Sequence, residues 1–324
     1  MRVTRSRAKT GEEAMNGRQG GHAKLALEAG GLPHIANGAG VVEPELRWRL
    51  ILRRIGRGGV VTGLAIITWS ALFPLIFMID VTFRTQSDWE HSELGWPTTW
   101  PTQAFEGAWV QGDVGLFFRN SMIITVGSVA LSLVLASMAG YSFGRLRWRG
   151  QWGTYVFLLL WMAVPPLFLM VPIYVEMTRL HLLNTYASVI LLYAAINVPF
   201  NTYLMTTYFR MLPGELMDAA KVDGAGIHRL FLRVMLPMSM PVLATLCIFD
   251  FLYVWNEFLF ALLLLSNNNI KTLTVGILQL TGGRIVTDYP ILMAALLIAS
   301  APVIGIYVFF QKYLVRAIVA GAVK

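Results

Sequence analysis

The feature that most constrains this chain is a set of long windows without charge. Crossing a hydrocarbon layer of roughly 30 Å takes about 20 helical residues, and a lone charge near its centre costs about 2.5 to 3.5 kcal/mol on insertion scales. Five windows free of Asp, Glu, Lys and Arg are long enough, and a sixth, between Arg233 and Lys271, contains only Asp250 and Glu257. The sequence therefore predicts an all-α integral membrane fold with six transmembrane helices, at about 60–79, 120–142, 154–175, 186–209, 242–265 and 290–311.

The amino-acid composition agrees with several transmembrane spans and excludes some other classes of protein. Hydrophobic residues make up 56% of the 324 residues and charged residues only 14%, whereas a soluble domain carries about 25% charged residues. Cys247 is the single cysteine, which excludes a disulfide framework. The five histidines show none of the spacings of zinc sites, so we expect no metal site.

Basic residues indicate how the helices are oriented. None of the 26 Lys and Arg residues falls in a predicted span, and 21 of them lie in residues 1–59, 143–153, 210–241 and 312–324. Short loops on the cytoplasmic side of a membrane carry the excess of Lys and Arg. Both termini and the loops 143–153 and 210–241 are therefore predicted to be cytoplasmic.

The N-terminal 50 residues differ from the remainder of the chain. Residues 1–50 are polar, Gly-rich and basic, and they lack the apolar core of a signal peptide. We interpret them as a basic, disordered cytoplasmic tail, and residues 51–324 as the six-span domain. The basic residues of the tail lack a folded surface interleaved with aromatic residues, so no nucleic-acid partner is expected.

The loop 210–241 is predicted to contain two short amphipathic helices joined at a glycine. Pro213 starts the first helix, over 215–222, and Gly224 can take the positive φ that a sharp turn after it requires. The apolar face of this first helix is predicted to consist of Leu216, Ala219 and Ala220.

The second helix of this loop is predicted from apolar residues at helical spacing, Ile227, Leu230, Phe231, Val234 and Met235. We expect it to stop at Pro237 and Pro241, because proline interrupts a helix. From these residues alone, the helix pair could enter a groove on a soluble partner or lie on the lipid surface.

The same loop resembles the EAA loop of permease subunits from binding-protein-dependent ABC importers. The resemblance rests on residues that would couple the chain to an ATPase: Glu215, Asp218, Ala219, Ala220, Asp223, Gly224 and Ala225. Asp218 stands where that family usually has glutamate. The run from Trp255 to Phe258 resembles the family's signature in the fifth span, and the run from Phe310 to Arg316 resembles the C-terminal tail of its carbohydrate-uptake branch.

This resemblance implies a type I ABC importer permease fold and a sugar permease subunit of the maltose-transporter type. It also implies the partners: a second permease subunit, two ATPase subunits that use ATP, and an extracytoplasmic sugar-binding protein, all at a bacterial inner membrane. The chain has no G-x-x-x-x-G-K-[ST] motif, so we expect it to bind no ATP of its own and no other cofactor. The loop 213–236 would be the coupling helix, seated in a cleft of one ATPase subunit.

Six polar residues in the spans are candidates either for the translocation path or for contacts between helices: Asn197, Asn201, Asp250, Trp255, Asn256 and Glu257. Intramembrane carboxylates usually face a cavity or a partner rather than lipid. Asp250 and Glu257 are seven residues apart, so they are expected on one face of the fifth span, about 10 Å apart along its axis. Tyr193, Tyr253 and Trp255 could stack on sugar faces.

The sequence also has to be weighed against functions other than sugar import. Importer permeases for polyamines, phosphate esters or peptides share the same loop. A proton-coupled secondary transporter would use Asp250 or Glu257 as its titrating group, but such proteins usually show two related halves, and the sequence has no such repeat. An intramembrane enzyme would need a nucleophile with a base at depth, and Cys247 stands alone, so no enzymatic activity is expected.

Overall fold

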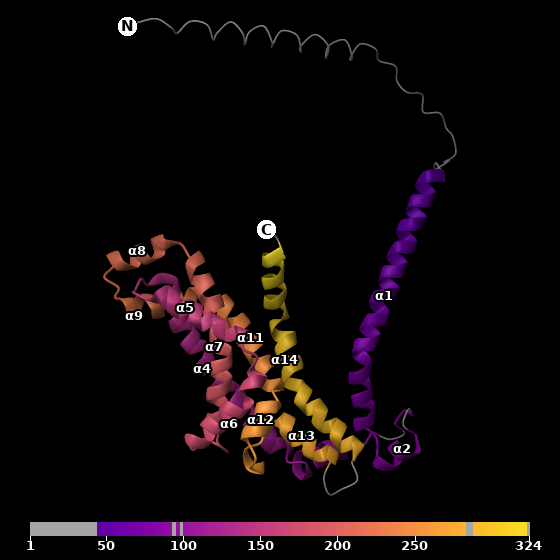
Figure 1. Ribbon diagram of the computed structural model, residues 1–324. Helices are drawn as coiled ribbons and strands as arrows, with labels where there is room; N and C mark the ends of the chain where they lie inside the picture. The colour runs from indigo at the N-terminus through magenta and orange to yellow at the C-terminus, as the bar shows by residue number, and fades with distance from the viewer. Residues whose placement is uncertain (1–43, 93–94, 98–99, 283–287, 323–324) are drawn as a thin grey trace, which may run out of the picture. The chain divides into compact units, whose positions relative to one another are not determined.

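The computed structural model describes residues 44–92, 95–97, 100–282 and 288–322, and every regular element in these residues is helical (Figure 1). The α-helices are α1 (Pro44–Thr82), α2 (Gln86–His91), α3 (Gln103–Glu106), α4 (Val114–Arg145), α5 (Gln151–Leu160), α6 (Met170–Arg179), α7 (Tyr186–Met211), α8 (Gly214–Val222), α9 (Ile227–Leu230), α10 (Leu236–Met238), α11 (Met240–Asn256), α12 (Leu259–Leu264), α13 (Leu273–Gly282) and α14 (Tyr289–Ala322). Short 3₁₀ segments cover Trp161–Ala163, Pro166–Leu169 and Asn268–Ile270, and π-helical turns cover Gly107–Gln111 and Phe231–Met235.

The chain divides into two compact units, Met1–Ile67 and Thr68–Lys324. What is described of the first unit is the N-terminal part of α1, which begins at Pro44. Residues 1–43 of the predicted tail 1–50 lie outside the described residues. Residues 44–50 belong to α1 and are helical. The second unit contains all the other helices and every site discussed below.

Helix length and composition fit a membrane protein. Four helical stretches are long and apolar enough to cross a membrane: Gly59–Thr82, Val114–Arg145, Tyr186–Met211 and Tyr289–Phe310. Two bent pairs also pass if each pair counts as one span: 151–163 with 166–179, bent by 93°, and 227–238 with 240–256, bent by 73°. The predicted all-α membrane fold is confirmed, and the four to six candidate spans are compatible with the six predicted.

Two of the predicted helices are wrong as continuous elements. The segment 154–175 breaks at Val164, whose backbone is extended (φ −86°, ψ 114°), because Pro165 and Pro166 lack N–H donors and disfavour helix in the residue before them. The segment 242–265 breaks at Glu257, which is also extended (φ −69°, ψ 133°), and α12 starts again at Leu259.

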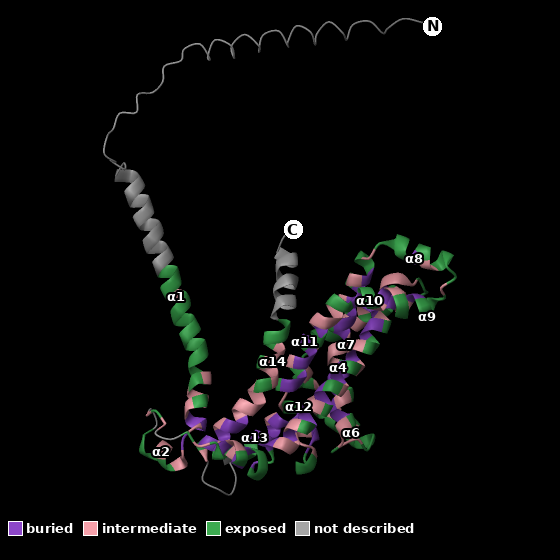
Figure 2. Ribbon diagram, turned by 180° about the vertical axis from the view of Figure 1, so that it is seen from behind, coloured by how far each residue is buried: buried purple, intermediate pink, exposed green. Residues whose placement is uncertain are grey.

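The core of the second unit is the contact between α4 and α7, with α11 packed beside them; buried residues run along all three helices (Figure 2). Buried small side chains recur along α4: Ser121, Thr125, Ser128, Ser132, Ala136 and Gly140. At Gly140 the approach is so close that an added Cβ would lie 2.5 Å from Cβ of Met205. Small residues at four-residue spacing let two membrane helices pack backbone to backbone in this way.

The end of the bundle opposite α8 is joined by polar contacts (Figure 1). Asn120 on α4 donates to the backbone oxygens of Asn269 and Lys271, each at 3.0 Å, and it accepts from the hydroxyl of Tyr186 on α7 at 2.7 Å. The N–H of Leu273, the first residue of α13, donates to Oγ of Ser121 at 2.7 Å. These contacts hold the short helices after α11 against the two long helices.

Candidate functional site

The segment Pro213–Met238, here called the projection, begins with α8 and a turn that needs glycine. Gly224 has φ +76°, as its predicted role at the turn requires. The N–H of Ala225 donates to the oxygen of Ala220 and the N–H of Gly224 to that of Lys221, each at 2.9 Å. This is the Schellman arrangement that ends a helix on a left-handed residue. It sets the direction in which the chain leaves α8.

The projection is attached to the bundle by three buried side chains, Met217, Leu230 and Met235, which pack in one cluster with Tyr141, Met205, Phe209 and Leu246. The covered face of α8 is therefore not the whole predicted apolar face of Leu216, Ala219 and Ala220. Met217 is buried and Ala220 half-buried, whereas Leu216 and Ala219 are exposed. Met217 and Ala220 share a helix face at i, i+3 spacing, and the neighbouring helices decide that this face is the one covered.

The predicted coupling residues lie mainly on the outer surface of the projection. Glu215, Asp218, Ala219, Asp223 and Gly224 are exposed, and Ala220 and Ala225 are half-buried. Apolar side chains are exposed beside them, with Val222 88% and Ile227 49% exposed. The outer surface of α8 therefore combines carboxylates with uncovered apolar side chains.

The second helix of the projection does not stop at Pro237, which corrects the prediction. The N–H of Leu236 donates to the oxygen of Phe231 in a π-helical turn, so Pro237 falls in the first turn of α10, where a missing N–H costs little. The break comes instead at the buried residue Ser239, and Pro241 falls in the first turn of α11. The projection therefore continues into α11 through one bend of 73°.

Three buried polar side chains join α4, α7 and α11 and are here called the three-helix contact. Nδ2 of Asn201 donates to Oγ of Ser132 at 2.8 Å and to Oδ2 of Asp250 at 2.7 Å. Asn201 and Ser132 are fully buried and Asp250 is 3% exposed. Asn201 and Asp250, both candidates for the path or for helix contacts, are thus placed in a contact within this chain.

Glu257 lies at the break after α11 and caps α12. Its Oε1 accepts from the N–H of Phe260 at 2.9 Å, its Oε2 accepts from the N–H of Ala261 at 3.2 Å, and the hydroxyl of Tyr193 donates to the same carboxylate. The prediction that it shares one helix face with Asp250 is wrong, because α11 ends at Asn256. Tyr193 is fully buried, so the structure does not present its ring to a solute.

Trp255 and Asn256 line a pocket of about 580 Å³ together with Thr274 on α13 and Ser300 on α14. Nε1 of Trp255 donates to the oxygen of Ala299 at 3.0 Å, which ties α11 to α14. The side chain of Asn256 is exposed and donates to the oxygen of Leu252 at 2.7 Å. Asn197, the remaining candidate, is half-buried on α7 and does not line this pocket. The six polar candidates are therefore not brought to a single site.

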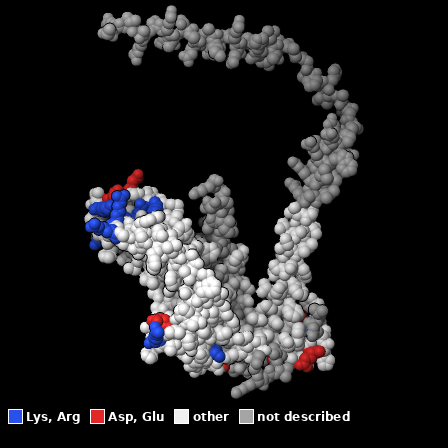
Figure 3. Space-filling view, in the orientation of Figure 1, with Lys and Arg blue, Asp and Glu red and all other residues white. Residues whose placement is uncertain are grey.

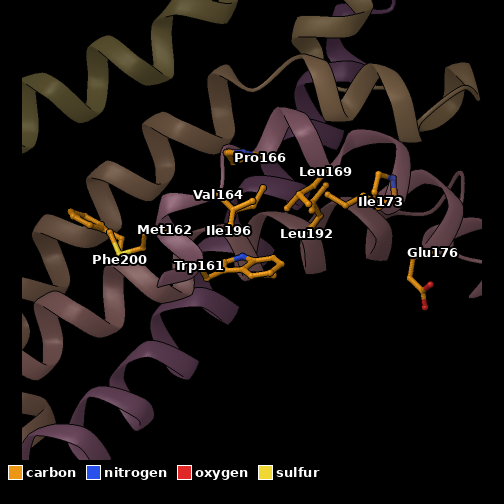
Figure 4. A pocket seen from close by; sticks show the side chains of 12 residues that line it. Trp161, Met162, Val164, Pro166, Leu169, Ile173, Glu176, Leu192, Ile196 and Phe200 are labelled. Atoms are coloured by element: carbon orange, nitrogen blue, oxygen red, sulfur yellow. The ribbon is translucent and has the colours of Figure 1, made fainter. Parts of the chain in front are cut away.

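A second pocket, of about 670 Å³, lies where the broken pair α5–α6 faces α7 (Figure 4). Its lining is apolar around Trp161, Leu192 and Phe200, and Glu176, the one charged residue of the lining, lies apart from that group. None of the six polar candidates lines it. Its surface offers few hydrogen-bonding groups for a hydroxyl-rich solute.

Sequence reasoning missed two residues that organise these sites, Ser132 and Ser239. Ser132 could have been found from the spacing of small residues along α4, which marks the face that a second helix approaches. Ser239 gave no comparable signal, since the prolines on either side of it predicted breaks at other positions.

Comparison with known proteins gives one family. Residues 132–320 match the model of the family described as binding-protein-dependent transport system inner membrane component. The chain is 33% identical to the arabinooligosaccharides transport system permease protein AraQ of Halalkalibacterium halodurans, over 87% of this chain and 98% of that protein. It is 30% identical to the diacetylchitobiose uptake system permease protein NgcG of Streptomyces coelicolor, over 80% of this chain and 87% of that protein.

A solved structure shares the fold. A chain in the crystal structure of a bacterial ABC transporter involved in the import of the acidic polysaccharide alginate superposes with a TM-score of 0.73. The match covers 81% of this chain and 96% of that chain at 22% identity, so it shows the fold alone. The fold of this chain is therefore shared with a chain of that ABC transporter.

Proposed function

The chain belongs to the family of binding-protein-dependent transport system inner membrane components, and on this premise we propose that it forms part of the translocation path of an ATP-driven sugar importer. The observation that carries the proposal is the exposed surface of α8 on a projection anchored to the bundle by Met217, Leu230 and Met235. The chain itself performs no catalysis in this proposal and binds no cofactor.

The projection is proposed to couple the chain to an ATPase subunit. A groove on that subunit would hold α8. The residues proposed to contact the groove or to form the turn after α8 are Glu215, Asp218, Ala219, Ala220, Asp223, Gly224 and Ala225. Movement of the projection would pass to the spans because Met235 packs in the buried cluster and the chain continues through Ser239 into α11. Closure of the ATPase pair would then rock the spans between inward-open and outward-open states.

The assembly proposed for the chain has a second permease subunit, two ATPase subunits that use ATP, and an extracytoplasmic sugar-binding protein. Its place would be a bacterial inner membrane with both termini cytoplasmic. Lys and Arg gather at the end of the second unit that carries α8 (Figure 3), which supports a cytoplasmic position for that end.

A sugar is the proposed solute because two relatives at similar identity are named for the transport of different oligosaccharides. Because the two relatives are named for different oligosaccharides, they support sugars as a class of solute and not one particular sugar. On this chain, the pocket lined by Asn256, Thr274 and Ser300 offers amide and hydroxyl groups that match sugar hydroxyls, with Trp255 beside them. Asn201 and Asp250 are proposed to join α7 and α11 to each other and thereby to stabilise the helices around the translocation path.

The coupling proposal is tested by Gly224→Asp in the assembled importer reconstituted into vesicles. We expect membrane insertion to be retained and transport to be lost, because an aspartate side chain is placed at a left-handed turn on the docking surface. Gly226→Asp is the matched control: Gly226 has φ −68° and precedes α9, where aspartate is a favourable cap. Transport at the wild-type rate in Gly224→Asp would overturn the coupling assignment.

A further inference from the structure

A third pocket, of about 410 Å³, lies beneath α8 at the ends of α4 and α7. Four cationic side chains line it, Arg145, Arg147, Arg210 and Lys221, against one carboxylate, that of Asp218. Figure 3 shows Lys and Arg gathered at this end of the second unit. The pocket is therefore cationic, and its polar surface differs from the apolar pocket beside α5 and α6.

Only some of the polar and cationic side chains in this pocket are used to cap the C-terminus of α4. Nε2 of Gln151 donates to the oxygens of Ser142, Phe143 and Leu146, at 2.9 to 3.1 Å, and Arg210 donates to Phe143 at 3.2 Å. These bonds satisfy carbonyls at the C-terminus of α4, where cations are also favourable.

The remaining cations of the pocket are less engaged. Nη2 of Arg145 donates to the oxygen of Leu212, but its buried Nε has no hydrogen-bond partner. Within the described residues, the side chain of Arg147 has no hydrogen bond or ion pair. Lys221 pairs with Asp218 at 3.1 Å, but both side chains are more than half exposed, so this pair is weak. The pocket keeps donors and positive charge that the chain itself does not use.

The surroundings of the pocket place it at the boundary between lipid and water. It lies at the ends of two long apolar helices, and Trp148 and Trp152, 41% and 73% exposed, follow the end of α4. Exposed tryptophans are typical of this boundary. Further along α5, Phe157 is 71% and Leu160 is 62% exposed, which provides an apolar surface for acyl chains next to the charged pocket.

We propose that this pocket binds the phosphate of an anionic glycerophospholipid headgroup, with Arg147 and Lys221 contacting the phosphate and the acyl chains lying along α5. Basic pockets between transmembrane helices recognise anionic headgroups in this way. The bound lipid would hold α8 against the end of α4, since Lys221 belongs to α8 and Arg147 to the turn after α4. This inference rests on the pocket itself and not on the solute that the importer carries.

The test uses the full-length chain purified with the subunits it assembles with, and measures retained phospholipid by native mass spectrometry. Arg147→Gln with Lys221→Gln should retain phosphatidylglycerol about thirtyfold less than the wild type, as expected for the loss of two basic contacts. Arg149→Gln with Arg229→Gln is the matched control, because it removes the same charge from exposed residues outside the pocket. Arg147→Lys with Lys221→Arg keeps the charge and should retain the lipid.

Three outcomes would overturn the proposal. Equal loss of lipid in the control pair would show diffuse attraction to the surface, and undiminished retention in the pocket pair would show that the pocket is not used. Displacement of the lipid by millimolar inorganic phosphate or glycerol phosphate as effectively as by phosphatidylglycerol vesicles would assign the pocket to a soluble phosphate compound. Because the readout is bound lipid, a loss of transport in the same variants does not affect the result.

Discussion

The three-helix contact and the projection use polar residues in opposite ways. In the three-helix contact, Ser132, Asn201 and Asp250 are buried and bonded to one another across three helices. In the projection, Asp218 and Asp223 are exposed, and so is the apolar residue Val222. The first region bonds its polar side chains to one another, although Oδ1 of Asn201 is left without a hydrogen-bond partner among the described residues. The second region leaves a surface for another molecule.

This difference predicts which substitutions change stability and which change only function. Leaving a buried polar group without its partner costs about 1 to 3 kcal/mol, and more when the group is charged. An exposed substitution away from special backbone positions usually changes stability by less than about 0.5 kcal/mol. Substitutions of buried residues in the three-helix contact should therefore destabilise the chain. Substitutions of exposed residues in the projection should leave the chain folded but unable to support transport.

The largest expected effect is at the closest approach of α4 and α7. Gly140→Leu should prevent folding, because even its Cβ would lie 2.5 Å from Cβ of Met205 and 3.1 Å from the backbone of residues 205 and 206. Size-exclusion chromatography of the detergent-solubilised chain should show aggregate in place of a single peak. Gly305→Leu, on α14 with no atom within 4 Å of an added Cβ, should elute like the wild type. A normal peak for Gly140→Leu would mean that the two helices are not packed as described.

A smaller loss of stability is expected within the three-helix contact. Asn201→Leu removes both hydrogen bonds and leaves the carboxylate of Asp250 buried without its amide donor, at a cost of about 3 kcal/mol. Its melting temperature in detergent should fall, and the double variant with Asp250→Leu should recover part of the loss. If Asn201→Leu melts like the wild type, the buried contact is not what holds α7 to α11.

The smallest effect on stability is expected at the tip of the projection. Val222→Ser replaces a side chain that is 88% exposed, so its melting temperature should stay near that of the wild type. Transport by the reconstituted importer should nevertheless fall, because the apolar contact with the ATPase would be lost. A drop in stability without a change in transport would reverse the comparison between the two regions.

The sequence predicted local structure more successfully than packing. Windows without charge located the four long helices, and Gly224 was correctly expected at a left-handed turn, because both depend on nearby residues alone. Leu216 was predicted on the apolar face of α8 and is exposed, since periodicity defines a face but not which neighbour covers it. Glu257 was placed within a helix in error, because a carboxylate can end one helix and cap the next without a change in local pattern.

The bent pairs show the same limit of prediction. The segment 154–175 was predicted as one span, and the structure has a bend of 93° at Pro165 and Pro166. The size of such a bend depends on the helices packed around it, here α7. The pairing of Asn201 with Ser132 and Asp250 likewise depends on the register of three helices that are distant in the sequence.

The central claim, that α8 docks on an ATPase subunit, is tested most directly by site-specific photocrosslinking in the assembled importer. A benzoylphenylalanine in place of exposed Val222 should form a covalent adduct with the ATPase subunit on illumination. The same photoprobe in place of Met217, which is 8% exposed and faces the bundle, should form none. If the photoprobe at position 222 crosslinks to lipid alone, or crosslinks to no protein, the account is contradicted.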